Sequence, residues 1–287
     1  MNPITFSRKI SANAEKIWQL LTNPELMKIW YFTVHNFQLQ EGSEFYFYEN
    51  ETGGEFLHRC KILKVTPGKI FEHTWEYPEI VKGVSVVKWE LKALEENLTL
   101  VTLTHSGTEQ FAEAGAMFRR ESFEQGWYEI LLILRNKLHK IENLSFEKEI
   151  NASPSNVWKA LWDRNNYTQW TQFFSEGSQL LGNLEKNAKI LLVDGSKNGM
   201  YSEISDFEEN SKLVMKHLGM VENGKELPID AEAEKWTETT ESYFLTPFSG
   251  GTLLRVEVQM TNEHKDFMEK AFKPALEEVK KIAENQV

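Results

Sequence analysis

The residues best suited to chemistry in the first half of the chain are histidines and tryptophans on neighbouring predicted strands. Trp75 and Trp89 occupy the apolar phases of two strands, and Trp127 lies on the apolar stripe of a predicted helix. His73 shares the phase of Trp75, so its imidazole is expected to point inward, where it could orient a ligand oxygen or transfer a proton near neutral pH. An inward histidine is also a common hydrogen-bonded core residue. The candidate ligand-binding set of this half is His73, Trp75, Trp89, His105 and Trp127.

Two tyrosines could add hydroxyl groups at the rim of the same site. Tyr46 and Tyr48 alternate with Phe45 and Phe47 along one short aromatic strand. Because successive side chains of a strand point to opposite faces, either the tyrosines or the phenylalanines can face inward. The sequence leaves both phases open.

The second half of the chain carries a comparable set, formed by Tyr201, Glu203, Met215, His217 and Tyr243. An inward Glu203 beside His217 would be a candidate acid–base pair, whereas a solvated strand face would explain the same glutamate without a function. The sequence assigns a catalytic role to no residue, and binding is the favoured reading over catalysis.

Metal and nucleotide motifs are absent. The sequence contains no HExxH, paired CxxC or EF-hand loop, and Cys60 is the only cysteine. The segment from Gly219 to Lys225 resembles the start of a phosphate-binding loop, but Glu226 stands where Ser or Thr would hold magnesium, so a mobile loop is predicted there. We therefore expect no metal and no cofactor.

Composition excludes several classes of partner. The 287 residues carry a formal net charge of −11 without a basic cluster, which argues against nucleic acid. A single cysteine excludes an intramolecular disulfide. The sequence contains no run of about 18 apolar residues, so insertion into a membrane is not expected. A cytoplasmic protein is expected. The acidic excess lies in the second half, because residues 1–142 carry 16 basic and 19 acidic side chains, and the remainder carries 16 and 24.

An internal repeat organises the chain. Matching residues recur 140 positions apart without a gap, among them the pairs Phe6 and Phe146, Trp18 and Trp158, Trp30 and Trp170, and Gly42 and Gly182. Two copies of this length indicate a tandem domain duplication, with predicted domains 1–142 and 143–287. The four repeated tryptophans are expected to be scaffold, since packing is what two copies with different pockets would share.

Each copy has the same predicted order of elements: a strand, two short helical segments, a run of antiparallel strands and a long amphipathic helix. In the first copy these are strand 4–10, helix 14–21, a helical turn carrying Trp30, strands 44–49, 56–66, 69–77, 84–94 and 98–105, and helix 116–139. In the second they are strand 146–150, helix 154–162, strands near 188–193, 201–207, 212–218, 236–246 and 252–261, and helix 263–284. The fold class is α+β, with the long helix covering the apolar face of the sheet.

The first copy resembles the START-like (SRPBCC) superfamily, specifically the domain homologous to activators of the heat-shock protein 90 ATPase. The resemblance lies in EKIWQLLTNPELMKIW (15–30), Gly42, KVTPGKIFEHTW (64–75), TLVTLTHSG (99–107) and GWYEILLILRNKL (126–138). The second copy looks like a more divergent member, through VWKALWDRNNYTQW (157–170), SKLVMKHLG (211–219) and GGTLLRVEV (250–258).

This resemblance implies two tandem helix-grip domains, each a curved antiparallel sheet wrapped around its C-terminal helix, with a cavity between sheet and helix. Family members bind lipids, hormones, polyketides or other apolar small molecules, and some catalyse cyclisation or dehydration. The favoured function is therefore binding of an apolar small molecule. The alternatives are a polyketide cyclase or dehydratase and a module that interacts with a chaperone, because fold alone does not fix function.

Overall fold

The computed structural model describes residues 2–49 and 56–285, and the chain divides into two units, Met1–Leu138 and His139–Val287. The division lies four positions before the predicted boundary after residue 142. The difference arises because strand β7 (Ile141–Ile150) begins five residues earlier than predicted, directly after the first unit's closing helix. Each unit is α+β and has its own hydrophobic core.

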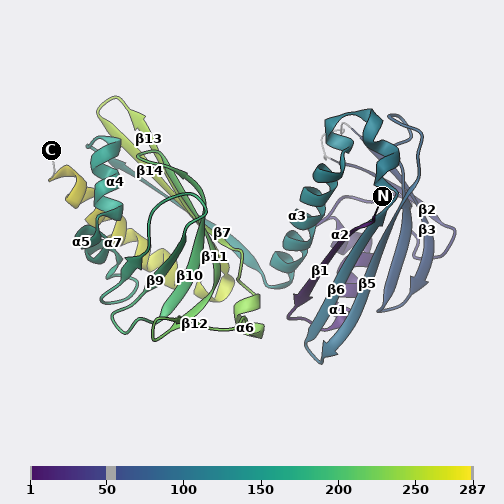
Figure 1. Ribbon diagram of the computed structural model, residues 1–287, viewed down its shortest axis with the longest axis horizontal. Coiled ribbons are helices and arrows are strands. Elements are labelled where there is room, and N and C mark those ends of the chain that lie inside the picture. Colours follow the sequence, from purple (N-terminus) through teal and green to yellow (C-terminus); the bar gives the residue numbers. More distant parts are fainter. Residues whose placement is uncertain (1, 50–55, 286–287) are drawn as a thin grey trace. The chain divides into compact units, whose positions relative to one another are not determined.

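The first unit is a six-stranded antiparallel sheet with the order β1-β6-β5-β4-β3-β2. The strands are β1 (Ile4–Ile10), β2 (Glu44–Tyr48), β3 (Leu57–Thr66), β4 (Ile70–Trp75), β5 (Ser85–Glu95) and β6 (Leu98–Ser106). The long helix α3 (Arg120–Leu138) runs along one face of this sheet (Figure 1) and buries an apolar stripe that includes Trp127, Leu131 and Leu134. This is the predicted helix-grip arrangement.

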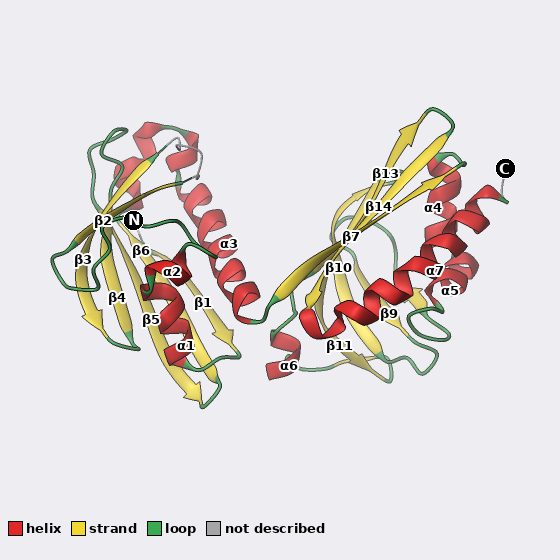
Figure 2. Ribbon diagram, turned by 180° about the vertical axis from the view of Figure 1, so that it is seen from behind, coloured by secondary structure: helices red, strands yellow, loops and turns green. Residues whose placement is uncertain are grey.

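The second unit repeats the arrangement with eight strands, in the order β7-β14-β13-β11-β10-β9-β8 and with β12 paired to β11. Its further strands are β8 (Gln179–Leu181), β9 (Lys189–Val193), β10 (Gly199–Glu208), β11 (Lys212–Glu222), β12 (Lys225–Glu226), β13 (Thr240–Phe248) and β14 (Gly251–Thr261). The closing helix α7 (Lys265–Glu284) packs on the sheet, and α4 (Pro154–Trp162) and α5 (Arg164–Thr171) lie beside it (Figure 2). No helix in the described part of the chain is long and apolar enough to span a membrane.

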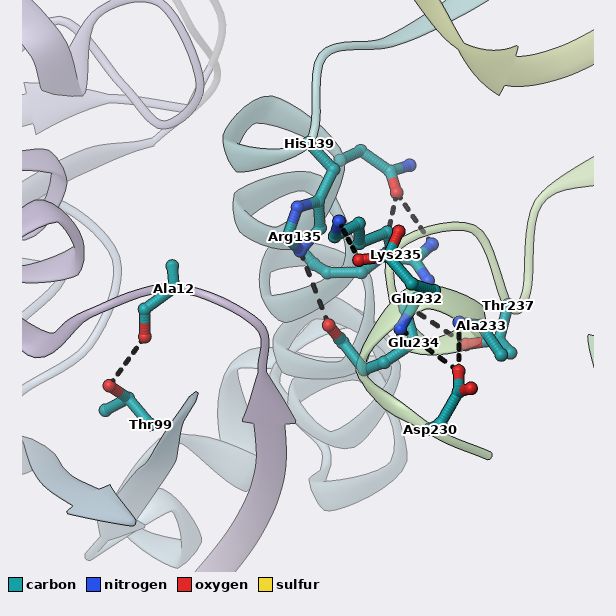
Figure 3. Close-up of polar contacts among 11 residues, drawn as sticks. Ala12, Thr99, Arg135, His139, Asp230, Glu232, Ala233, Glu234, Lys235 and Thr237 are labelled. Atoms are coloured by element: carbon teal, nitrogen blue, oxygen red, sulfur yellow. Dashed lines mark hydrogen bonds and ion pairs between the residues drawn. The ribbon is translucent and has the colours of Figure 1, made fainter. Parts of the chain in front are cut away.

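The repeat extends to individual hydrogen bonds. The buried Thr99 hydroxyl donates to the Ala12 carbonyl at 2.8 Å (Figure 3), and Thr252 donates to the Ala152 carbonyl at 2.8 Å in the second unit. In both units these bonds tie the turn after the first strand to its neighbouring strand. A buried carbonyl left without a donor would cost about 1–3 kcal/mol, which explains why a threonine is used twice.

The repeated tryptophans are scaffold, as predicted. The Trp30 indole N–H donates to the Leu20 carbonyl, and the Trp170 indole N–H donates to the Leu161 carbonyl, both at 2.9 Å. These carbonyls lie near the C-terminal ends of α1 (Ala14–Thr22) and α4, where a helix lacks its own donors. Trp18 and Trp158 are also buried in the cores of their units.

In the second unit, strand β8 is not among the predicted strands, and two predicted segments take a different form. The predicted strand 236–246 begins only at Thr240, because Asp230 caps a short helix, α6 (Ala231–Glu234), by accepting from the amides of Glu232 and Ala233 (Figure 3). The predicted mobile loop is a β-hairpin instead. Asn223 and Gly224 have φ values of 50° and 77°, as a tight two-residue turn requires, and they connect β11 to β12.

The first unit also contains a connection that the sequence did not predict. Two 3-10 helices, η1 (Thr108–Ala114) and η2 (Ala116–Phe118), join β6 to α3, so α3 begins four residues later than predicted. Gly115, with a φ of 127°, separates the two helices. η1 and η2 bring Phe111 and Phe118 into the core.

Candidate functional site

The predicted histidine–tryptophan set of the first unit does point inward, but the interior around it is filled. His73, Trp75, Trp89, His105 and Trp127 are each at most 5% exposed. The cavity lined by His73 and Trp89, together with Trp30 and neighbouring apolar side chains, measures about 10 Å³. A single water molecule needs about 10–15 Å³, so this cavity has no room for a lipophilic ligand.

His105 belongs to a closed chain of hydrogen bonds. The Trp127 indole N–H donates to His105 Nδ1 at 2.9 Å, so the proton of the neutral ring is on Nε2, which lies 2.7 Å from Ser85 Oγ. The Ser85 hydroxyl in turn donates to the Trp75 carbonyl at 3.1 Å. Burial, and then the neighbouring His73, lowers the pKa of His105 to about 3. Every polar atom of this chain has a partner within the core, which is the geometry of a structural histidine.

His73 is also held by the protein itself. Its Nδ1 donates to the Thr74 carbonyl at 2.8 Å, because a carbonyl can only accept. Burial lowers the pKa of His73 to about 4, with the Thr74 hydrogen bond acting in the opposite direction. At neutral pH the ring is therefore uncharged and lies against a cavity that cannot admit a ligand.

The tyrosine phase of β2 faces away from the core. Phe45 and Phe47 are 2% and 0% exposed, whereas Tyr48 is 40% exposed and Tyr46 is half-buried. Tyr46 stacks on His35 at 5.0 Å between ring centroids, outside the core cluster. The two phenylalanines therefore take the inward positions, and the predicted rim hydroxyls do not reach the interior.

The candidate acid–base pair of the second unit does not form, and the alternative of a solvated strand face for Glu203 describes the structure. Glu203 lies opposite Lys216 in the β10–β11 register, at 3.9 Å from its ammonium, and its side chain is 38% exposed. Tyr201 packs in a small separate cluster with Val193 and Val221. Glu203 thus lies on the solvated strand face, and Tyr201 lies outside the main core.

A different carboxyl group lies beside His217. Glu241 of β13 approaches His217 Nε2 with its Oε2 at 3.7 Å, and it accepts a hydrogen bond from the Tyr243 hydroxyl. On the other side of the ring, His217 Nδ1 lies 2.8 Å from Ser202 Oγ. Met215, directly opposite Glu241 in the register, is also buried in this core. The structure therefore brings together three predicted residues, Met215, His217 and Tyr243, with Ser202 and Glu241.

Burial disfavours the charged form of both titratable groups in this hydrogen-bonded set. Burial lowers the pKa of His217 to about 4. Burial also raises the pKa of Glu241 above its ordinary value, and the Tyr243 hydrogen bond opposes that effect. The aromatic ring of Tyr243 packs against Trp162 at 4.9 Å and Trp170 at 6.2 Å between centroids. These hydrogen-bonded side chains thus lie directly behind an aromatic wall, formed by Trp162, Trp170 and the ring of Tyr243.

The outer side of that wall is a hollow of about 340 Å³. Its lining comes from the end of α4, the first turn of α5, β8 and the turn after β8, through Trp162, Arg164, Tyr167, Leu180, Leu181, Gly182 and Leu184. Trp162 and Tyr167 stack at 6.2 Å with an interplanar angle of 24°. The volume lies at the lower end of the range typical of small-molecule pockets, about 300–1,000 Å³.

Glycine is required at one point of this lining. Gly182 has a φ of 123°, and a Cβ there would lie 2.9 Å from the Lys189 carbonyl oxygen. The close approach of the turn after β8 to β9 therefore depends on a residue without a side chain. The repeat predicts this glycine, because it matches Gly42 in the first copy.

The sequence did not single out the residues of this hollow. RNNYTQWT, which forms α5, has little apolar periodicity, and the three-residue strand β8 is too short for an alternating pattern. The repeat itself contains the missing signal. A second helical turn carrying Trp30 is predicted in the first copy, and the match of Trp30 to Trp170 transfers that turn to α5.

The described residues contain no group of three or more His, Cys, Asp and Glu side chains arranged to hold a metal ion.

Residues 11–138 match the family model described as activator of Hsp90 ATPase homolog 1-like protein. This match lies within the first unit and covers nearly all of it. No curated protein matches the chain significantly.

Solved structures show partial likeness to the chain. Protein MLL2253 from Mesorhizobium loti is 24% identical over 48% of this chain and 98% of its own length, with a TM-score of 0.40. The Aha1 dimer from Colwellia psychrerythraea is 26% identical over 48% of this chain and 96% of its own, with a TM-score of 0.39. The di-domain ARO/CYC StfQ from the steffimycin biosynthetic pathway is 11% identical over 98% of both chains, with a TM-score of 0.39.

Proposed function

Because residues 11–138 match the model of the activator of Hsp90 ATPase homolog 1-like family and the cavity beside His73 is too small for a ligand, we propose that the chain binds a small apolar molecule in the hollow of its second unit. The observation that carries this proposal is the difference in volume between the two sites, about 340 Å³ against about 10 Å³. The proposed ligand site does not lie between the sheet and the closing helix, where the cavity was expected. Its lining comes from α4, α5, β8 and the turn after β8.

Part of the wall of the hollow can contact a flat apolar ring. Trp162 and Tyr167 form one side, and Leu180, Leu181 and Leu184 supply aliphatic surface. Aromatic side chains of this kind offer large contact areas to planar rings. The ligand has no assigned identity, and the cytoplasmic location stays a prediction.

The cyclase or dehydratase alternative loses the pair on which it was based. Glu203 is on the solvated face, and His73 contacts a cavity without room for a substrate. In the second unit Glu241 lies beside His217 instead, but both lie behind the aromatic wall. His217 is hydrogen-bonded to Ser202, and Glu241 is hydrogen-bonded to Tyr243. Binding without turnover is therefore the function that the geometry favours.

We expect Leu184→Trp to weaken ligand binding while the second unit stays folded. Leu184 is half-buried in the turn after β8, so a larger side chain there extends into the hollow. Binding of 2-naphthamide and 2-naphthoate, measured by isothermal titration calorimetry, should weaken by about 10-fold or more, because the indole occupies the volume that the ligand needs.

The matched control is Leu227→Trp, the same substitution at a residue that is 38% exposed and lies outside the hollow in the second unit. It should leave the affinity for both naphthalene compounds unchanged. Equal binding by the two variants would exclude the hollow as the site. The absence of binding by the unaltered chain across a wider panel of apolar compounds would refute the proposal as a whole.

A second candidate function is an interaction of the first unit with a chaperone. The family match of residues 11–138 favours it, because the matching model is described by its relation to an activator of the Hsp90 ATPase. The deciding measurement is whether the full chain stimulates the ATPase of a purified heat-shock protein 90.

A further inference from the structure

The polar groups at the hollow of the second unit are hydrogen-bond donors. Arg164 is exposed at its edge and forms no ion pair or side-chain hydrogen bond within the described part of the chain. An unpaired guanidinium is unexpected here, because this half of the chain carries 24 acidic side chains against 16 basic ones. Arginine presents a planar set of N–H groups that matches a carboxylate.

A second donor lies deeper in the same wall. Tyr167 is 8% exposed, and its hydroxyl has no hydrogen-bond partner among residues 2–49 and 56–285. Because Tyr167 lines the hollow and its hydroxyl is not fully enclosed, a ligand there can supply the acceptor that this hydroxyl lacks within the protein. Burial raises the pKa of Tyr167, and the Glu241 carboxylate raises it further, so the phenol keeps its proton and can donate.

Two further sets of N–H groups lie close to these side chains. The Trp162 indole Nε1 is buried without a partner. The N-terminal end of α5 is also open to an acceptor, because the side chain of its N-cap residue, Asp163, makes no capping hydrogen bond. The amides of a helix N-terminus favour negative charge.

We infer that the ligand of the hollow carries a carboxylate or a similar oxyanion, which pairs with Arg164 and accepts a hydrogen bond from Tyr167, while its apolar body contacts Trp162 and the leucines. This inference rests on the proposed function and specifies its ligand class. It predicts a small aromatic or aliphatic acid, where the shape of the hollow alone would admit any apolar molecule of the same size.

Two carboxyl groups could oppose an anion at this place. Asp163 precedes Arg164 in the chain but does not line the hollow. Glu241 lies behind Tyr167, and its carboxyl is bound by the Tyr243 hydroxyl. Burial raises the pKa of Glu241 and so favours its neutral form. The Arg164 charge is therefore the only full charge in the lining of the hollow.

The test compares 2-naphthoate with 2-naphthamide, which have the same ring system and differ in charge. The full chain should bind the carboxylate about 10-fold more tightly than the amide at low ionic strength, since hydrogen bonds to a charged group are stronger than those between neutral groups. This preference should shrink as salt is added. Equal affinities for the two compounds would overturn the inference while leaving the proposed function intact, and binding of neither would overturn both.

Three variants locate the preference. Arg164→Gln should remove most of the 10-fold preference, because it weakens carboxylate binding only. Tyr167→Phe should weaken carboxylate binding by about 5-fold, because it removes the hydroxyl donor and keeps the packing of the ring. Arg255→Gln is the matched control, because Arg255 lies outside the hollow and already pairs with Glu257 at 3.3 Å. A preference that survives Arg164→Gln, or that disappears equally in Arg255→Gln, would contradict the assignment.

Discussion

Lowering the pH from 7 to 5 is expected to reduce the free energy of unfolding of the first unit by about 5 kcal/mol. Three of its histidines are buried with lowered pKa values: His58 and His105 at about 3 and His73 at about 4, against 6.5 in the unfolded chain. Desolvation of the charged ring is the largest cause for each.

The sign follows from proton uptake. Between about pH 6.5 and pH 4 the unfolded chain binds protons at these three sites and the folded unit does not, so acid favours unfolding. The second unit has one such residue, His217, at about 4. It also has Glu241, whose raised pKa gives the opposite effect, because the folded unit takes up that proton first. The second unit should therefore lose much less stability.

The tryptophans allow both units to be followed in one sample. The 9 tryptophans divide into five in the first unit and four in the second, and the indole N–H resonances of Trp127 and Trp170 can report urea unfolding of each unit at both pH values. His58→Phe is the informative variant. The His58 ring stacks on Phe47 at 4.5 Å, and its Nδ1 is buried without a partner. This substitution should remove about a third of the pH dependence, and an unchanged dependence would contradict the explanation.

Trp127→Ala is expected to destabilise the first unit by about 3–5 kcal/mol and to leave the second unit unchanged. The Trp127 ring is 2% exposed and contacts Trp75 at 5.3 Å and His105 at 5.6 Å between centroids. Its removal opens a cavity in a packed core and also leaves His105 Nδ1 without its donor. A loss of this size approaches the whole stability of a domain.

A graded series separates packing from hydrogen bonding. Trp127→Phe keeps most of the aromatic volume but not the N–H group, so it should cost less than Trp127→Ala and more than about 1 kcal/mol. The measurement is urea unfolding followed through the Trp89 and Trp170 indole resonances. A cost below about 1 kcal/mol for Trp127→Ala would indicate that the first unit tolerates an open cavity, contrary to the filled interior described above.

The architecture of the two units could be predicted from the sequence because the repeat and the strand alternation agree at the main strands and the closing helices. Trp30 and Trp170 occupy the same position in both copies and make the same hydrogen bond, so a pattern in the chain became a specific contact. The inward phase of strands β4 and β5 was also predictable, since Trp75 and Trp89 define it.

The site was less predictable, for two physical reasons. Burial of Tyr201 in a separate cluster and bulges in the β10–β11 register make the phase of Glu203 unreadable from alternation. A set of inward aromatic residues can either surround a cavity or fill it. The outcome depends on how side chains from different elements pack together, and local sequence patterns do not predict that packing. Arg164 and Tyr167 lie on a short helix of weak periodicity, so their juxtaposition with β8 appears only in three dimensions.

The most direct test of the central claim, that the small-molecule site lies in the second unit, is a titration of the full ¹⁵N-labelled chain with 2-naphthoate, followed through the indole N–H resonances. We expect the Trp162 resonance to shift with ligand concentration, because Trp162 lines the hollow, while the resonances of Trp30, Trp89 and Trp127 stay in place. Saturable shifts of Trp89 or Trp127 with Trp162 unchanged would contradict the claim and return the site to the cavity of the first unit.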